Sequence, residues 1–247
     1  MTVSKKHPRT PSSDTKAPRR SITPLHDTPT KLVEAALSLF ARHGIEAVSI
    51  RQITLAAGQS NESAVHYHFR NKAGLIAAVL DYVNAQLAPM QREALDQLNA
   101  MAQQRAPTVR EIVTLGVMPF VRFHAQSSTG RKSIRFLSRL TWQSNEGGLT
   151  LLIESLWPYY QNIESHLARA LPHKPLVTLR LHGVLAISNV IHSLADTRLL
   201  GEELDLGIAS DLVKDPLQLL SHFIDYIIGG LCSDERTGLT NTPPSSP

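Results

Sequence analysis

The sequence contains a single cysteine, Cys232, and few aromatic residues. One cysteine excludes an intrachain disulfide and any metal site built from several cysteines. Aromatic residues make up only 5% of the chain, so we expect cores of leucine, isoleucine, valine and alanine, which suit helices. No stretch approaches ~18 uninterrupted apolar residues, and the N-terminus lacks an apolar signal segment. We therefore expect a cytoplasmic protein with no membrane association.

Motifs that carry catalysis are also missing from the sequence. We find no glycine-rich phosphate loop, no nucleophile elbow and no pair of carboxylates on one helix face. The histidines of the C-terminal part follow no catalytic spacing; they are His124, His166, His173, His182, His192 and His222. The sequence therefore predicts no enzyme, no catalytic residue and no cofactor.

Positive charge is concentrated at the N-terminal end of the chain. The net charge is +4 over residues 1–27, +2 over residues 28–75 and −2 over the remainder. This asymmetry is typical of a protein whose front end contacts a polyanion. A solvated basic tail without a partner explains residues 1–27 equally well.

Hydrophobic periodicity is helical almost throughout, and no run alternates in the manner of a strand, so we predict an all-α fold. Four helices are expected in the N-terminal part, of which the second opens with the capping-box pattern Ser49-Ile50-Arg51-Gln52. Gly58 permits a sharp turn after it. The first is expected to begin at Pro29, with Thr28 as its N-cap, and to stop at Gly44. The others are expected over Ile50 to Ala57, over about Glu62 to His68, and from Lys72 onward, capped by Asn71. This outline is typical of a helix-turn-helix domain, and small helical bundles with other roles share it.

Several spaced sequence motifs, in addition to this outline, resemble those of a known family. They are Leu32-Val33-Glu34-Ala35-Ala36-Leu37-Ser38-Leu39-Phe40-Ala41-Arg42-His43-Gly44, Ser49-Ile50-Arg51-Gln52-Ile53, Ala56-Ala57-Gly58, and Tyr67-His68-Phe69-Arg70-Asn71-Lys72 with Leu75. In this order, over residues 28–80, they resemble the DNA-binding head of the tetracycline-repressor (TetR) family. From Gly58 to Phe69 the chain is one residue longer than the common family spacing, so we expect the turn to take its own path.

The resemblance implies an all-helical homodimer that binds a palindromic operator and is released by a small-molecule effector. The third helix of each head would enter the major groove. The resemblance implies phosphate contacts from Ser49, His66, Tyr67, His68 and Lys72, and base contacts from Gln59, Ser60, Asn61 and Ser63. The corresponding domains are a disordered basic tail over 1–27, a helix-turn-helix DNA-binding domain over 28–75, a helical-bundle ligand-binding and dimerisation domain over 76–232, and a disordered tail over 233–247.

Elementary chemistry agrees with several of these roles. Lys72 opens a helix, whose unpaired N–H groups and positive dipole end favour a phosphate. The amides of Gln59 and Asn61 suit bidentate pairing with adenine, whereas the ring of Tyr67 could contact phosphate or pack into the core. His66 and His68 are two residues apart, with no acidic or cysteine partner, so we predict no metal site.

The C-terminal part carries no comparable signature. A ligand pocket is predicted from its aromatic and neighbouring residues, which are Met118, Phe120, Phe123, His124, Trp142, Trp157 and Tyr160; aromatic residues at helical spacing are equally ordinary core. Two apolar segments, Leu176–Leu194 and Leu217–Leu231, are predicted to pair with their copies in a homodimer, with burial inside one subunit as the alternative. A ligand-independent DNA-binding repressor or activator also remains open as the function.

Overall fold

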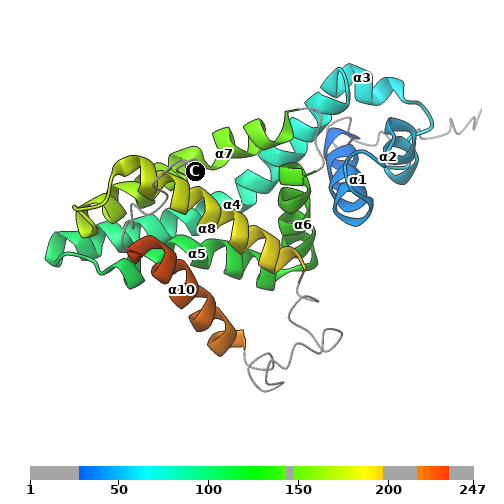
Figure 1. The fold of residues 1–247 in the computed structure, drawn as a ribbon. Coiled ribbons are helices and arrows are strands. Elements are labelled where there is room, and N and C mark those ends of the chain that lie inside the picture. Colours follow the sequence, from blue (N-terminus) through cyan, green and yellow to red (C-terminus); the bar gives the residue numbers. More distant parts are fainter. Residues whose placement is uncertain (1–27, 143–146, 197–215, 234–247) are drawn as a thin grey trace, which may run out of the picture.

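The computed structural model describes residues 28–142, 147–196 and 216–233, and all regular structure within these ranges is helical. The expected all-α fold is therefore confirmed (Figure 1). The helices are α1 Thr28–His43, α2 Ile50–Ala56, α3 Ser63–Phe69, α4 Lys72–Gln104, α5 Val109–Gln126, α6 Ser128–Trp142, α7 Gly148–Ala170, α8 Leu176–Ala195 and α10 Pro216–Cys232. The tails predicted to be disordered lie outside the described residues, apart from Ser233.

Helices α1, α2 and α3 form a head at one end of the molecule (Figure 1). The apolar stripe of α1 supplies most of its core, since Leu32, Ala36 and Phe40 are fully buried there. Ile53 of α2 and Val65 of α3 are fully buried as well, so each short helix turns one apolar side inward. These short helices depend on this burial, because isolated helices of seven residues are unstable in water.

Local side-chain chemistry sets the ends of the short helices. Ser49 and Gln52 form the expected capping box. The backbone N–H of Gln52 donates to Ser49 Oγ at 3.2 Å, and the backbone N–H of Ser49 donates to Gln52 Oε1 at 2.8 Å. Gly58 has φ +71°, a left-handed conformation that glycine adopts without strain. Asn71 caps α4 as expected, because its Oδ1 accepts from the Gly74 amide at 2.8 Å.

The 33-residue helix α4 connects the head to the larger body. It neither ends nor breaks at Pro89, which lies inside it. In the body, α5 packs along α4, and α7 and α8 cover the same core (Figure 1). Helix α6 also reaches the head, where Phe136 stacks on Phe40 of α1 with ring centroids 6.1 Å apart. The core is therefore continuous from the head into the body.

Two local expectations needed correction. Thr28 was expected as the cap of the first helix, yet it is already the first helical residue of α1. The third helix was expected at about 62–68, and α3 occupies Ser63–Phe69. Both shifts are one residue, which is the scale on which fraying ends differ.

Candidate DNA interface and effector cavity

Helix α3 presents a polar face to solvent. Ser63, His66, Tyr67 and His68 are all exposed, whereas Val65 between them is fully buried. Tyr67 is 85% exposed, and its ring contacts that of His68 edge-on at 4.9 Å between centroids. Core packing of Tyr67, the alternative left open by the sequence, is therefore excluded. Its hydroxyl is accessible to a phosphate oxygen.

The turn before α3 holds Asn61 in a defined place. Asn61 Oδ1 accepts from the Ser63 amide at 2.9 Å and from Ser63 Oγ at 2.8 Å. Because bidentate pairing with adenine needs both the oxygen and the nitrogen of the amide, Asn61 must share or release these bonds to pair in that way. Ser60 is exposed, and Gln59 is half-buried beside it.

His66 is engaged within the protein. Its Nδ1 lies 3.0 Å from the carbonyl oxygen of Arg70. A carbonyl can only accept, so Nδ1 carries the proton in this bond. In the neutral ring Nε2 is then an acceptor, and His66 can donate to a phosphate only as an imidazolium.

The junction between α3 and α4 is tightly folded. Arg70 has φ 67° and ψ −50°, and the Asn71 amide donates across it to the Phe69 carbonyl at 2.8 Å. This is a γ-turn of the rare, strained kind. Gly74 faces the same carbonyl so closely that a Cβ at residue 74 would lie 2.0 Å from Phe69 O. The junction therefore sets the position of α3 relative to Lys72, which is half-buried at the start of α4.

Ser49 lies at the start of α2, as its N-cap. Its side chain is exposed, and its Oγ both accepts from the Gln52 amide and donates to Gln52 Oε1 at 3.0 Å. A phosphate contact from Ser49 Oγ would compete with the second of these bonds.

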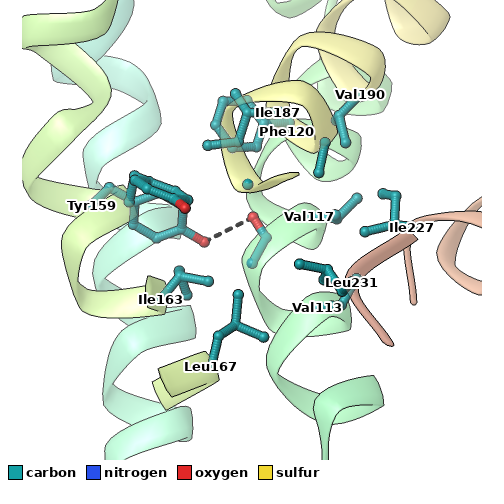
Figure 2. A pocket seen from close by; sticks show the side chains of 14 residues that line it. Val113, Val117, Phe120, Tyr159, Ile163, Leu167, Ile187, Val190, Ile227 and Leu231 are labelled. Atoms are coloured by element: carbon teal, nitrogen blue, oxygen red, sulfur yellow. Dashed lines mark hydrogen bonds between the residues drawn. The ribbon is translucent and has the colours of Figure 1, made fainter. Parts of the chain in front are cut away.

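The body contains a half-open apolar cavity of about 50 Å³ between α5, α7, α8 and α10 (Figure 2). Its polar groups include the Tyr159 hydroxyl, which donates to the Gly116 carbonyl at 3.0 Å. Burial raises the pKa of Tyr159 well above its ordinary value, so this hydroxyl stays protonated. The lining residues are Val113, Gly116, Val117, Phe120, Tyr159, Tyr160, Ile163, Leu167, Gly183, Ala186, Ile187, Val190, Ile227 and Leu231.

A second cavity of about 60 Å³ lies between α6, α7 and α8. It is equally apolar apart from the indole N–H of Trp157 and the hydroxyls of Thr141, Tyr160 and Ser188. Its lining residues are Thr141, Leu149, Leu152, Ile153, Leu156, Trp157, Tyr160, Val184, Ile187, Ser188 and Ile191. Tyr160 and Ile187 line both cavities.

The predicted ligand residues divide between cavity and core. Phe120, Trp157 and Tyr160 line one or both cavities. Met118, Phe123 and His124 line neither cavity, and the side chain of Trp142 lies outside the described residues. The sequence prediction, which was based on aromatic residues, missed most of the lining residues. The lining residues of α5 could have been found from their helical spacing; they are Val113, Gly116, Val117 and Phe120.

His124 lies beside the basic face of α6. Burial lowers the pKa of its imidazole, and the positive charges of Arg131 and Arg135 lower it further. We therefore expect a neutral ring at pH 7, packed at the edge of the core.

Helices α8 and α10 leave apolar side chains uncovered. Val177, Leu181 and Leu185 of α8 are 73%, 57% and 52% exposed, and Tyr226 of α10 is 65% exposed. An open groove of about 590 Å³ runs between the two helices. It contains His182, whose buried Nδ1 has no hydrogen-bond partner among the described residues. An apolar surface of this extent is typical of a protein–protein contact.

The described part of the chain carries neither a metal site nor a membrane-spanning helix. Residues 28–142, 147–196 and 216–233 hold no group of three or more histidine, cysteine or acidic side chains placed to bind a metal ion. None of the helices in these ranges is both long enough and apolar enough to cross a membrane.

Sequence comparison identifies both parts of the chain. A profile for bacterial regulatory proteins of the tetR family matches residues 32–79, and a profile for the tetracyclin repressor-like C-terminal domain matches residues 116–230. Among curated proteins, none matches the chain.

Solved structures of similar fold are transcriptional regulators. A TetR-family transcriptional regulator from Rhodococcus sp. has a TM-score of 0.56 at 14% identity, covering 83% of this chain and 97% of its own. FadR from Bacillus subtilis, solved with stearoyl-CoA, has a TM-score of 0.55 at 16% identity, covering 81% and 98%. At these identities the structures support the fold alone. Together with the two profile matches, they show that the chain belongs to the TetR family of bacterial transcriptional regulators, which are DNA-binding proteins and not enzymes.

Proposed function

We propose that this regulator is a ligand-responsive repressor, which binds a palindromic operator as a homodimer in the cytoplasm and is released by a small-molecule effector. The observation that carries this proposal is the exposed polar face of α3, together with the apolar cavities of the body that the continuous core connects to the head. Residues 28–75 would form the DNA-binding domain, and residues 76–232 would form the ligand-binding and dimerisation domain.

We place the DNA contacts on the head as follows. Lys72 would bind a phosphate at the start of α4, where the helix dipole assists it. The exposed hydroxyl of Tyr67 supports a second phosphate contact. The remaining phosphate contacts would come from Ser49, His66 and His68, and base contacts from Gln59, Ser60, Asn61 and Ser63.

The dimer would form through α8 and α10. Their uncovered apolar side chains and the groove between them support this surface, because a second copy would bury them. Leu181→Glu is expected to shift sedimentation toward the monomer, since it places a charge on that face. Leu55→Glu, which replaces a 61% exposed leucine of α2, is the matched control and should leave the dimer intact. If the Leu181→Glu protein remained dimeric, the dimer interface would have to lie on another surface.

The first experiment is to capture sheared genomic DNA on the purified protein at ~150 mM salt and to sequence what is retained. An inverted repeat with half-sites about one helical turn or more apart supports the proposal. Retention without a shared repeat contradicts it.

Two variants then test the roles of head residues on the operator so found. Lys72→Ala is expected to weaken binding to all DNA sequences and to lower the salt slope by ~1. Asn61→Ala is expected to relax discrimination at particular base pairs, with little change in salt slope. An unchanged affinity and slope for Lys72→Ala would mean that the head docks in another way.

One observation favours a second candidate, a repressor or activator that needs no ligand. The two cavities are about 50 and 60 Å³, whereas ligand pockets usually span roughly 300–1,000 Å³. This candidate predicts that no small molecule loosens the operator complex.

A further inference from the structure

The two cavities of the body meet at two residues that line both of them. Tyr160 of α7 lines both of them, and Ile187 of α8 is the other residue that they share. The first cavity continues toward α5 and α10, and the second toward α6. A single apolar channel crossing the body would result if the Tyr160 ring turned aside.

Neither cavity alone would bury more than a small part of an effector. An apolar cavity of roughly 150 Å³ holds benzene, a molecule of six carbons. In that proportion, cavities of about 50 and 60 Å³ each hold about two carbons. A larger ligand must therefore occupy both of them, together with space that the Tyr160 ring now fills.

Tyr160 is held in place by contacts that can be exchanged. Its hydroxyl donates to the carbonyl oxygen of Leu179 at 3.0 Å, with that of Arg180 at 3.3 Å. Both carbonyls belong to α8, where they also accept helical hydrogen bonds from amides four residues later. Loss of the tyrosine bond leaves neither carbonyl without a donor, so only the hydroxyl needs a new partner.

The ring rests on a glycine of the facing helix. A Cβ at residue 183 would lie 2.0 Å from Tyr160 Oη and 2.3 Å from its Cε2. Gly183 is thus the position where an added methyl group would expel the ring from its present place. This gives a genetic means of displacing Tyr160 without a ligand.

The pairing of α7 with α8 does not depend on this ring. Arg180 Nε donates to Glu164 Oε1 at 2.9 Å, and Glu164 is only 5% exposed. The same guanidinium lies 5.1 Å from the ring centroid of Trp157. These contacts lie one turn to either side of Tyr160 along α7, so the two helices can stay together while the ring moves.

From this geometry we propose that the two cavities are the ends of one binding site for a linear aliphatic chain, and that Tyr160 is the partition that the chain displaces. None of the described residues that line the two cavities carries a charge, so the bound portion of the ligand is uncharged. The polar side-chain groups of the lining are hydroxyls and the indole N–H of Trp157, which suits a chain with at most one neutral polar end. The role of this site in regulation rests on the proposed function.

The test uses straight-chain 1-alkanols of two to ten carbons as probes of the full-length protein. Binding is followed by the fluorescence of Trp157, whose ring centroid is 5.6 Å from that of Tyr160, in a Trp142→Phe background. We expect affinity to rise about fourfold per methylene group up to at least eight carbons. A gain that stops at two to four carbons would show two separate cavities and overturn the proposal.

Two variants test the partition itself. Tyr160→Phe removes the hydroxyl bond to α8 and is expected to tighten decanol binding about fivefold. Gly183→Ala is expected to tighten it as well, because the ring is already displaced. Gly116→Ala adds a methyl group to the first cavity, 3.5 Å from the nearest atom of Ile163 and away from Tyr160, and should not tighten binding. Wild-type affinity in both Tyr160→Phe and Gly183→Ala would refute the role of Tyr160.

Operator binding, measured in the same samples, separates this inference from the proposed function. Chain-length-dependent binding without operator release supports the aliphatic site and contradicts ligand-responsive repression. An intact operator complex with no alkanol binding contradicts the aliphatic site and leaves DNA binding standing. Release that follows the same chain-length series supports both.

Discussion

Gly74→Ala is predicted to move α3 away from its DNA-binding position. A Cβ at this residue would lie 2.0 Å from Phe69 O, whereas real Cβ atoms essentially never approach within 3.0 Å of another atom. The obstacle is backbone rather than a flexible side chain. The last residue of α3 must therefore move by about 1 Å or more relative to α4.

The energetic effect combines a gain and a loss. Alanine favours a helix over glycine by roughly 0.5–1 kcal/mol, while an overpacked site loses roughly 1–3 kcal/mol. We expect the free energy of unfolding to fall by about 1 kcal/mol in net terms. The operator affinity should fall further, by about tenfold, because a displaced α3 misplaces at least one base contact.

Urea unfolding and fluorescence-anisotropy titration of the operator measure the two effects. Gly116→Ala is the matched control, since its Cβ would meet Ile163 at an ordinary 3.5 Å in the body. It should keep wild-type operator affinity. If Gly74→Ala bound the operator as tightly as the wild type, the junction would not determine the position of α3.

Two further predictions concern backbone strain and pH. Arg70→Gly should raise the free energy of unfolding by about 1 kcal/mol, because glycine relieves the strain at φ 67°; urea unfolding checks this, and an unchanged midpoint would contradict it. The hydrogen bond from Arg105, and then those from Thr108, lower the pKa of Glu111 from 4.5 to about 2. Because the folded-state pKa of Glu111 is lowered, its carboxylate stabilises the folded protein above pH 4.5, and this contribution to the free energy of unfolding is lost as the pH falls toward 2. Glu111→Gln should lack that part of the pH dependence of unfolding, and an identical pH profile would exclude a role for Glu111.

Local sequence alone determined much of the head. The capping box of Ser49 and Gln52, the turn at Gly58 and the cap at Asn71 each arise within a few residues, so short-range rules locate them. The apolar character of Leu176–Leu194 likewise predicted a helix, which is α8, although Val177, Leu181 and Leu185 of this helix are exposed in the single chain. The all-α fold followed from the same periodicity.

Tertiary structure decided which faces meet. Periodicity shows that Phe120, Phe123 and Tyr160 are inward-facing, but only packing determines that Phe120 and Tyr160 line a cavity while Phe123 does not. The approach of Gly74 to Phe69 O and of Gly183 to Tyr160 likewise depends on the separation of two helices. A sequence specifies the side chains on each helix, whereas the distance between helices results from the packing of all of them together.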